Sequence, residues 1–410
     1  MKILILGSGG REHALAWKLV QSVGASIYGA PGNPGFAGLG ACLPIKSITP
    51  EAYLQAAEAI GADLTVVGPE APLVAGVVDL FRSKGKRIVG PTRDAARLEG
   101  SKVFAKNFFR QSGIPTAAFA AVEDAAAARK VLDRFGFPVV LKADGLAAGK
   151  GVIIAHDRAE AEAGLAQLPG PLVIEEFLQG EEVSFIGICD GRDVLPLAPS
   201  QDHKAAFDGD TGPNTGGMGA YCDSAILSAS QTQEILNRVM YPVVESMKFT
   251  GFLYAGLMMT AAGPKVLEFN VRLGDPETQP ILHRMSSDLL PALLAATDGT
   301  IRDVQLDWRP QPSLCVVMAS RGYPGTCETG KPIHGIDLAE ATGATVFHAG
   351  TRMGSQGLET SGGRVLGVTA SGADLAQAID AAYRGVSQIH FDGMQYRRDI
   401  GHKGLRRAQA

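Results

Sequence analysis

The sequence has few cysteines, few aromatic residues (6%) and no long apolar run. Its five cysteines, at positions 42, 189, 222, 315 and 327, form no C-x-x-C pair, and an odd, scattered set is typical of a reducing compartment. The apolar stretch at 289–296 is broken by Pro291 and is far shorter than the ~20 residues that span a bilayer. The N-terminal apolar run is cut at Gly7 and then by Arg11 and Glu12, unlike a secretion signal. We therefore expect a cytoplasmic protein with no membrane partner.

The sequence also lacks an excess of basic residues. It has 38 Lys+Arg against 42 Asp+Glu, a net charge of −4, so we expect no nucleic-acid partner. With 46% hydrophobic residues, the 410-residue chain has the composition of a soluble protein, and its length allows roughly two to four domains of about 100–200 residues. Glycine, in contrast, is abundant at 51 residues and follows no G-X-Y period, which indicates loops that approach ligands.

Apolar periodicity predicts three regions. Strands at 2–6, 26–28, 64–67 and 87–89 alternate with helices at 12–21 and 74–84, which is typical of a parallel α/β domain over residues 1–100. A helix at 94–111 leads into a second region, 101–310, which contains a small α+β lid at about 115–178 that includes a helix at 122–135. After prolines 310 and 312, a C-terminal α+β domain occupies 311–410.

The first glycine-rich loop, Gly7-Ser8-Gly9-Gly10, follows a strand and opens a helix, where backbone N–H groups and the helix dipole bind anions. A dinucleotide fingerprint would require a third glycine where the chain has Glu12, and an acid where the second strand ends in Gly29-Ala30. We therefore predict that the loop binds the phosphate of another ligand. The alternative is a tight strand-to-helix turn that serves packing alone.

The second loop, residues 142–151, differs from a Walker A loop. Only three residues separate Gly145 from Gly149, and Lys150 is followed by Gly151 instead of Ser or Thr. A glycine-rich loop between two strands can cover a triphosphate, with Lys142 placing its charge on the phosphate oxygens. The alternative is a long hairpin loop.

Two further strands carry polar side chains that could bind a nucleotide and a metal. The strand at 172–178 ends in Glu175, Glu176 and Phe177, and backbone at such a connector can bind an adenine edge. In the strand at 265–270, alternation places Glu268 and Asn270 on one face, and two oxygen ligands suit Mg²⁺. Each pattern is also compatible with a solvated strand edge or face.

The loop at 202–219 is too long for a simple connection, and loops of this length are usually functional. It contains His203 and Lys204. No second histidine follows at metal-ligand spacing, so we interpret His203 as a surface or hydrogen-bonding residue.

Taken together, the long motifs resemble the phosphoribosylamine–glycine ligases, also called glycinamide ribonucleotide synthetases, which are ATP-grasp enzymes of purine biosynthesis. The motifs that carry the resemblance are residues 7–13 (GSGGREH), 68–73 (GPEAPL), 98–102 (LEGSK), 141–151 (LKADGLAAGKG), 267–278 (LEFNVRLGDPET) and 397–401 (RRDIG). The resemblance covers nearly the whole chain and implies an N-terminal parallel α/β substrate domain, an ATP-grasp core with its lid, and a C-terminal α+β domain.

The resemblance also implies a reaction and a set of roles. ATP, glycine and 5-phosphoribosylamine would give glycinamide ribonucleotide, ADP and phosphate through a glycyl phosphate intermediate, with Mg²⁺ or Mn²⁺ as cofactor. The implied ATP contacts are Lys102, Lys142, Gly145, Gly149, Lys150, Gly151, Glu175, Glu176, Phe177 and Glu182, the last as the ribose acid. The implied substrate contacts are Gly9, Gly10, Gly68, Pro69, Glu70 and Asp210. The implied catalytic residues are Lys142, Arg272 and Asp275, and the implied metal ligands are Glu268 and Asn270.

The chain departs from the family pattern at two positions. Gly256 stands where the wider superfamily has a second metal-binding acid, and Ala205 stands where an arginine usually follows His-Lys. Three alternatives stay open: another ATP-grasp ligase acting on a related purine-pathway ribonucleotide, an NAD-dependent oxidoreductase, and a non-catalytic nucleotide-binding regulator. Glu12 and the missing ribose acid disfavour the oxidoreductase, and the presence of Lys142, Glu268 and Asn270 disfavours the regulator.

Overall fold

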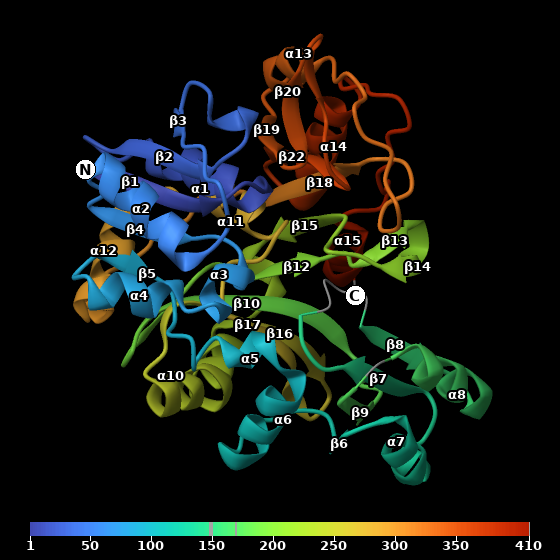
Figure 1. Cartoon of the computed structure of the whole chain (residues 1–410). Helices are drawn as coiled ribbons and strands as arrows, with labels where there is room; N and C mark the ends of the chain where they lie inside the picture. The colour runs from blue at the N-terminus through green and yellow to red at the C-terminus, as the bar shows by residue number, and fades with distance from the viewer. Residues whose placement is uncertain (147–150, 169, 410) are drawn as a thin grey trace.

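The computed structural model of the chain describes residues 1–146, 151–168 and 170–409. It has an N-terminal α/β unit, a lid and a large central sheet that continues into the C-terminal unit (Figure 1). Within the described ranges, no helix is long and apolar enough to cross a membrane.

The N-terminal unit is a five-stranded sheet of order β3-β2-β1-β4-β5 in which all pairings are parallel, as predicted. Alternation along β1 sends Ile3 and Ile5 to the face covered by α1, and Leu4 and Leu6 to the face covered by α2 and α4. Its strands are β1 (Lys2–Gly7), β2 (Ser26–Pro31), β3 (Gly40–Cys42), β4 (Leu64–Val67) and β5 (Ile88–Val89). Its helices are α1 (Gly10–Leu19), α2 (Pro50–Ile60), α3 (Glu70–Val74) and α4 (Val77–Ser83).

Two predicted helices are each broken in two. The helix expected at 74–84 is interrupted because Gly76 takes a left-handed conformation (φ 89°), which separates α3 from α4. The helix expected at 94–111 is interrupted at Ser101, whose backbone is extended and whose hydroxyl accepts a hydrogen bond from the N–H of Phe104. Ser101 therefore ends α5 (Arg97–Gly100) and caps α6 (Lys102–Gln111).

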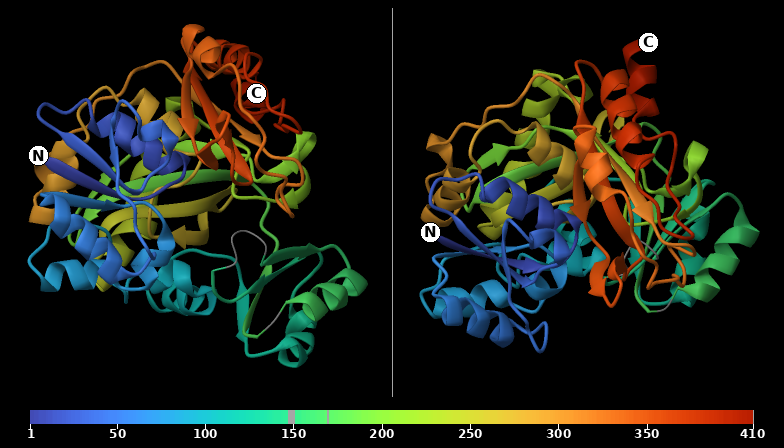
Figure 2. Two further views of the ribbon diagram at one scale, coloured as in Figure 1. Left: turned by 45° about the horizontal axis from the view of Figure 1, so that its top comes forward. Right: turned by 90° about the horizontal axis from the view of Figure 1, so that it is seen from above.

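The lid is a four-stranded antiparallel sheet of order β6-β9-β7-β8 with its own small core, and it projects from the rest of the molecule (Figure 2). Its elements are β6 (Phe119–Val122), α7 (Ala125–Val131), β7 (Val139–Ala143), β8 (Val152–Ala155), α8 (Arg158–Gln167) and β9 (Leu172–Glu176). The helix predicted at 122–135 was placed too early, since Val122 belongs to β6 and the side chain of Asp124 caps α7.

The central sheet has the strand order β17-β16-β10-β12-β15-β18-β22-β19, with β11 on β10. It crosses the boundary expected at residue 310, because β15 pairs with β18. Its strands are β10 (Glu181–Asp190), β11 (Val194–Pro196), β12 (Ser200–Asp202), β15 (Gly219–Cys222), β16 (Thr250–Thr260), β17 (Gly263–Asn270), β18 (Ser313–Ala319), β19 (Thr345–His348) and β22 (Arg364–Ser371). Two hairpins flank it: β13 (Ala205–Phe207) with β14 (Thr211–Asn214), and β20 (Thr351–Gly354) with β21 (Gly357–Thr360).

Helices cover both faces of this sheet. The apolar residues of β10 and β16 alternate between a core shared with α10 and a core shared with α12, so both faces of these strands are buried. The helices are α9 (Ala229–Ile235), α10 (Tyr241–Met247), α11 (Thr278–Arg284), α12 (Leu290–Asp298), α13 (Ile336–Ala341), α14 (Leu375–Val386) and α15 (His402–Gln409). The segment after β17 crosses from the central sheet toward α1, which brings residues 271–277 beside the first glycine-rich loop (Figure 1).

Candidate functional site

Glu12 organises the first glycine-rich loop. Its carboxylate accepts a hydrogen bond from the N–H of Gly9 (2.5 Å) and pairs with Arg11 (2.6 Å), and its side chain is only 2% exposed. A Cβ at Gly68 would overlap the Glu12 carboxylate, and one at Gly7 would come within 2.8 Å of it. The third glycine of a dinucleotide fingerprint is absent because a buried acid occupies that space and caps α1 from its first turn.

The chain that follows the proposed metal pair on β17 leads to Arg272, a cation whose side chain is 17% exposed. The Arg272 guanidinium donates to Glu99 (2.7 Å) and to the side-chain oxygen of Asn270 (3.2 Å), and it pairs with Glu70 (3.4 Å). Burial alone would lower the pKa of Arg272, but Glu99 and Glu70 outweigh it and hold the pKa above its ordinary value. Arg272 is therefore a permanent positive charge fixed between α3, α5 and β17.

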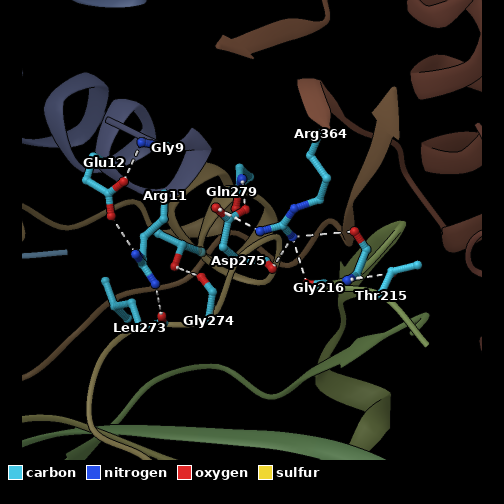
Figure 3. A network of polar contacts seen from close by, with 12 residues as sticks. Gly9, Arg11, Glu12, Thr215, Gly216, Leu273, Gly274, Asp275, Gln279 and Arg364 are labelled. Atoms are coloured by element: carbon cyan, nitrogen blue, oxygen red, sulfur yellow. Dashed lines mark hydrogen bonds and ion pairs between the residues drawn. The ribbon is translucent and has the colours of Figure 1, made fainter. Parts of the chain in front are cut away.

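Asp275 lies directly against the first glycine-rich loop. A Cβ at Gly9 would be 3.4 Å from one carboxylate oxygen of Asp275, and a Cβ at Gly10 would be 3.6 Å from the other. Gln279 of α11 donates to Asp275 at 2.9 Å, and Arg364 of β22 pairs with it at 3.5 Å (Figure 3). Burial alone would raise the pKa of this carboxyl, but Arg364, Arg11 and Gln279 together outweigh that effect and the pKa is lowered.

Arg364 brings the C-terminal unit into the site. One of its nitrogens donates to the backbone oxygens of Asp275 (2.5 Å), Gly216 (2.7 Å) and Gly217 (3.4 Å) (Figure 3). Gly217, with φ of 111°, packs so closely on Pro276 that a Cβ would lie 2.5 Å from it. The loop at 212–219, the segment at 274–277 and β22 are thus held together by one side chain.

The cations expected to bind phosphates lie between β17, the lid and α6. Lys142 of β7 contacts a carboxylate oxygen of Glu175 and donates to the backbone oxygen of Leu267 (3.3 Å). Lys102 at the start of α6 donates to the backbone oxygen of Gly145 (2.9 Å). The neighbouring Asp144 accepts from Ser101 and from the N–H of Val103, so the start of the glycine-rich loop is tied to α6.

The loop itself is described only at its ends. The N–H of Ala143 donates to the backbone oxygen of Gly151 at 2.8 Å, which closes the two strands at its base. Gly149 and Lys150 lie outside the described residues.

The residues expected around the adenine and ribose lie on the strands β9 and β10. The Glu175 side chain points to Lys142 and Lys106, whereas Glu176 pairs with Lys265 (2.9 Å) and Phe177 is 38% exposed. Glu182 pairs with Lys204 at 3.1 Å, and Lys204 also pairs with Asp202 at 3.1 Å. Lys204 lowers the pKa of Glu182, so this acid is ionised and can accept hydrogen bonds from hydroxyl groups.

Glu268 and Asn270 share one face of β17, as alternation predicts. Phe269 between them is buried and packs edge-on against Phe109. Gly256 is the cross-strand partner of Glu268, and a Cβ there would be only 3.6 Å from the Glu268 side chain. Within the described ranges, no group of three His, Cys, Asp or Glu residues could hold a metal ion. The pair Glu268 and Asn270 offers one carboxylate and one amide oxygen. A donor set of this size fits Mg²⁺, which keeps waters and substrate phosphates as its other ligands.

Asp210 is held by the C-terminal segment. It pairs with Arg397 (2.9 Å) and Lys403 (2.8 Å). His203 is 1% exposed and accepts from the N–H of Gly401 at 3.3 Å, so it is a hydrogen-bonding residue and not a surface residue. The backbone oxygen of Ala205 accepts from the buried Arg397 at 3.2 Å, which ties the loop to the chain end without the usual arginine.

The structure therefore brings the predicted residues into two neighbouring groups. Lys142, Glu175, Glu268 and Asn270 lie around β17 and the lid, and Glu70, Arg272 and Asp275 border Gly9 and Gly10. Pro69 lies beside the first glycine-rich loop, since a Cβ at Gly7 would be 2.9 Å from its ring.

Sequence reasoning assigned no role to several charged or polar residues that complete the site: Arg11, Glu99, Lys106, Gln279 and Arg364. Arg11 and Glu99 stand inside recognised motifs, so proximity in sequence could have identified them. Lys106 lies one helical turn after Lys102 on α6, so its spacing could also have identified it, whereas Arg364 is distant in sequence and only the fold brings it to the site.

Comparison with known proteins gives a consistent result. Three family models match: the N domain (residues 1–99), the ATP-grasp (A) domain (100–278) and the C domain (313–403) of phosphoribosylglycinamide synthetase. The chain is 51% identical to a phosphoribosylamine–glycine ligase from Ralstonia nicotianae, over 99% of this chain and 100% of that protein. It is 49% identical to one from Escherichia coli O6:H1, over 100% of both. The crystal structure of the phosphoribosylamine–glycine ligase from Thermotoga maritima matches with a TM-score of 0.85 and 35% identity, over 98% of this chain and 100% of that one. A biotin carboxylase from Campylobacter jejuni shares the fold at 15% identity (TM-score 0.71, 98% of this chain and 94% of that one).

Proposed function

Because this chain belongs to the phosphoribosylglycinamide synthetase family, we propose that it joins glycine to 5-phosphoribosylamine with the hydrolysis of ATP to ADP and phosphate. The product is glycinamide ribonucleotide, and the reaction belongs to purine biosynthesis. Its five free, scattered cysteines suit the reducing cytoplasm in which we expect it to work.

The chemistry requires activation of an unreactive group. A carboxylate does not acylate an amine until one of its oxygens becomes a leaving group. A glycine carboxylate oxygen attacks the γ-phosphorus of ATP, the bond to the β–γ bridging oxygen breaks, and ADP leaves. The amine nitrogen of phosphoribosylamine then attacks the acyl carbon of glycyl phosphate, phosphate leaves, and the nitrogen loses a proton.

One observation supports this proposal more than any other: the segment 267–275 touches both halves of the site. At one end, the Leu267 oxygen accepts from Lys142 of the lid. At the other end, Asp275 lies against Gly9 and Gly10 at the start of α1. A nucleotide bound at the lid and a phosphorylated substrate bound at the α1 N-terminus would meet along this segment.

The nucleotide side is assigned as follows. Lys102 and Lys142 neutralise the phosphates of ATP, and the glycine-rich loop between β7 and β8 covers them. The backbone of the connector at 175–177 holds the adenine and Glu182 holds the ribose, while the Glu175 side chain faces Lys106 and Lys142. Glu268 and Asn270 would hold Mg²⁺ or Mn²⁺, and the bound ion would stabilise the negative charge of the transferring phosphoryl group.

The substrate side uses the N-terminal unit. The α1 N-terminus at Gly9 and Gly10 suits the phosphate of phosphoribosylamine through the positive end of the helix dipole and the N–H of Gly10, since the N–H of Gly9 already donates to Glu12. Gly68, Pro69 and Glu70 border the same loop, and Asp210 lies on the loop held by the C-terminal segment. Arg272 and Asp275 border the place where the amine and the acyl group meet, with Arg272 supplying a fixed positive charge.

The experiment measures ADP release with Mg²⁺ and each substrate alone and in combination. We expect rapid ADP release only when glycine and phosphoribosylamine are both present, with glycinamide ribonucleotide formed one-to-one with ADP. Matched arms replace glycine with bicarbonate or another amino acid, and phosphoribosylamine with another purine-pathway ribonucleotide. Faster turnover in one of those arms would assign the chain to a different ATP-grasp ligation, and reduction of NAD would contradict the ligase assignment altogether.

A further inference from the structure

Three charged side chains form a buried cluster at the junction of α6 and the lid. Lys106 Nζ lies 2.5 Å from one carboxylate oxygen of Glu175, and Lys142 contacts the other. The side-chain exposures are 3% for Lys106, 2% for Glu175 and 9% for Lys142. Two cations therefore share one carboxylate in a place where unpaired charge is costly.

The two lysines are anchored very differently. Lys106 also donates to the hydroxyl of Thr116 (2.6 Å), which donates in turn to the Val266 oxygen (2.6 Å). Its ammonium group lies 5.6 Å from the centre of the Phe109 ring, within reach of a cation–π attraction. Among the residues that the structure describes, Lys142 has a long hydrogen bond to Leu267 (3.3 Å) besides its contact with Glu175. Lys106 is thus the fixed partner of Glu175, and Lys142 is the exchangeable one.

The cluster holds two ammonium groups and one carboxylate. Burial lowers the pKa of Lys106 to about 8, against the opposing attraction of Glu175 and with a further lowering by Lys142. Burial alone would raise the pKa of Glu175, but the two ammonium groups outweigh it and the pKa is lowered, so the carboxylate is ionised. One carboxylate cannot neutralise two ammonium groups, and the cluster carries an excess positive charge.

We propose that Lys106 is a positioning residue that holds Glu175 neutralised, so that Lys142 can exchange Glu175 for the phosphates of ATP. This rests on the proposed function, because it takes Lys142 as a phosphate ligand. Lys106 itself touches no substrate. When Lys142 turns to the nucleotide, the Glu175 carboxylate keeps the Lys106 ammonium and is never left as a buried unpaired charge.

If Lys106 is removed, Glu175 and the phosphates of ATP compete for Lys142. Without Lys106, Glu175 has Lys142 as its only cation, and drawing Lys142 to a phosphate would leave the carboxylate unpaired. ATP binding would then be opposed by the loss of one charge-assisted hydrogen bond, which weakens binding by about tenfold or more. Removing the charge of Glu175 in the same protein abolishes the competition and restores binding.

The test is a double-mutant cycle with Lys106→Met, Glu175→Gln and the double variant, measured on the full chain. Binding of ATP with Mg²⁺, without the other substrates, is followed by calorimetry, and KM for ATP and for glycine is measured separately. Arg129→Met is the matched control, because Arg129 also pairs with a carboxylate of the lid (Glu162, 2.6 Å) but on the exposed surface.

We expect Lys106→Met to weaken ATP binding about tenfold or more and to raise KM for ATP with little change in KM for glycine. The Kd of the double variant for ATP should be within about threefold of that of the unaltered protein. Arg129→Met should bind ATP as tightly as the unaltered protein does. Equal loss in the single and double variants would overturn the proposal, since it would mean that Lys106 supports the fold or contacts ATP. Unchanged binding in Lys106→Met would overturn it as well.

The design also separates this proposal from the proposed function. If the unaltered protein binds no ATP, the proposed function fails, whereas the outcomes above concern only Lys106. If Lys106→Met does not fold, the ATP affinity of Glu175→Gln decides whether Glu175 competes with ATP for Lys142. It should bind ATP at least as tightly as the unaltered protein, and weaker binding by Glu175→Gln would show that Glu175 aids the nucleotide instead of competing with it.

Discussion

Replacing Arg364 by Met should disable the substrate side of the site while leaving the nucleotide side intact. Arg364 makes two short hydrogen bonds to backbone oxygens, at 2.5 Å to Asp275 and 2.7 Å to Gly216, and its side chain is 22% exposed. Each hydrogen bond from a charged donor contributes about 1.5–3 kcal/mol. Because water can replace part of the hydrogen bonding of Arg364 in a partly exposed site, we expect the free energy of unfolding to fall by about 2–4 kcal/mol.

The kinetic effect should be selective. Met fills part of the space of Arg364 but leaves the Asp275 carboxylate and the loop at 216–217 without their shared anchor. We expect kcat/KM for glycine and phosphoribosylamine to fall by about 100-fold, roughly the rate equivalent of 2.7 kcal/mol, with ATP binding unchanged. Chemical denaturation, steady-state kinetics and calorimetry with ATP give the three readouts.

The control for Arg364 is Arg352→Met in the same C-terminal unit. Arg352 pairs with Glu359 at 2.6 Å, but its side chain is 59% exposed, so the loss should be below about 1 kcal/mol. Arg364→Lys should be intermediate, since lysine keeps the charge but not the planar set of donors. If Arg364→Met keeps normal kinetics for all three substrates, or loses ATP binding in parallel, the assignment of Arg364 to the substrate side is wrong.

Three other predictions address the metal, the nucleotide and the histidines. ATP with Mg²⁺, but not NAD, should raise the melting temperature in a thermal scan, because a ligand at 100 times its Kd stabilises the folded state by about 2.7 kcal/mol; stabilisation by NAD alone would count against the site. Glu268→Ala should lower kcat by about 100-fold or more at an unchanged melting temperature, since it removes a metal ligand from a partly exposed strand face; near-normal turnover at saturating Mg²⁺ would make Glu268 an ordinary strand residue. Burial and the neighbouring His348 lower the pKa of His13 to about 3. Between about pH 6.5 and pH 3 the unfolded chain therefore binds a proton that the folded chain does not, and the free energy of unfolding decreases as the pH is lowered. His13→Asn should reduce that slope by up to about 1.4 kcal/mol per pH unit in denaturation experiments, and an unchanged slope would show that His13 is protonated in the folded protein.

Much of the fold could be predicted because its strands are apolar and regular. The strand at 64–67 was placed at its observed bounds, and the parallel pairing in the first sheet followed from alternating strands and helices. The breaks at Gly76 and Ser101 were missed, since a left-handed glycine and a serine cap interrupt the helices locally while the apolar pattern continues through them.

Part of the site could also be predicted from the sequence, and part could not. Alternation along β17 was enough to place Glu268 and Asn270 on one face with Phe269 opposite. The pairing of Arg364 with Asp275 was not predictable, because Arg364 reaches the site only through tertiary packing. Glu12 is an intermediate case: the sequence showed that it excludes a dinucleotide loop, but only the structure shows it filling the space beside Gly68.

The most direct test of the central claim follows the oxygen atoms of glycine. If ATP activates the carboxylate, one carboxylate oxygen must leave with the phosphate. Glycine labelled with heavy oxygen in its carboxylate should therefore transfer one labelled oxygen to inorganic phosphate in each turnover, as seen by mass or by the phosphorus resonance shift. Unlabelled phosphate formed together with glycinamide ribonucleotide would contradict carboxylate activation by ATP and the roles assigned to Lys142 and Arg272.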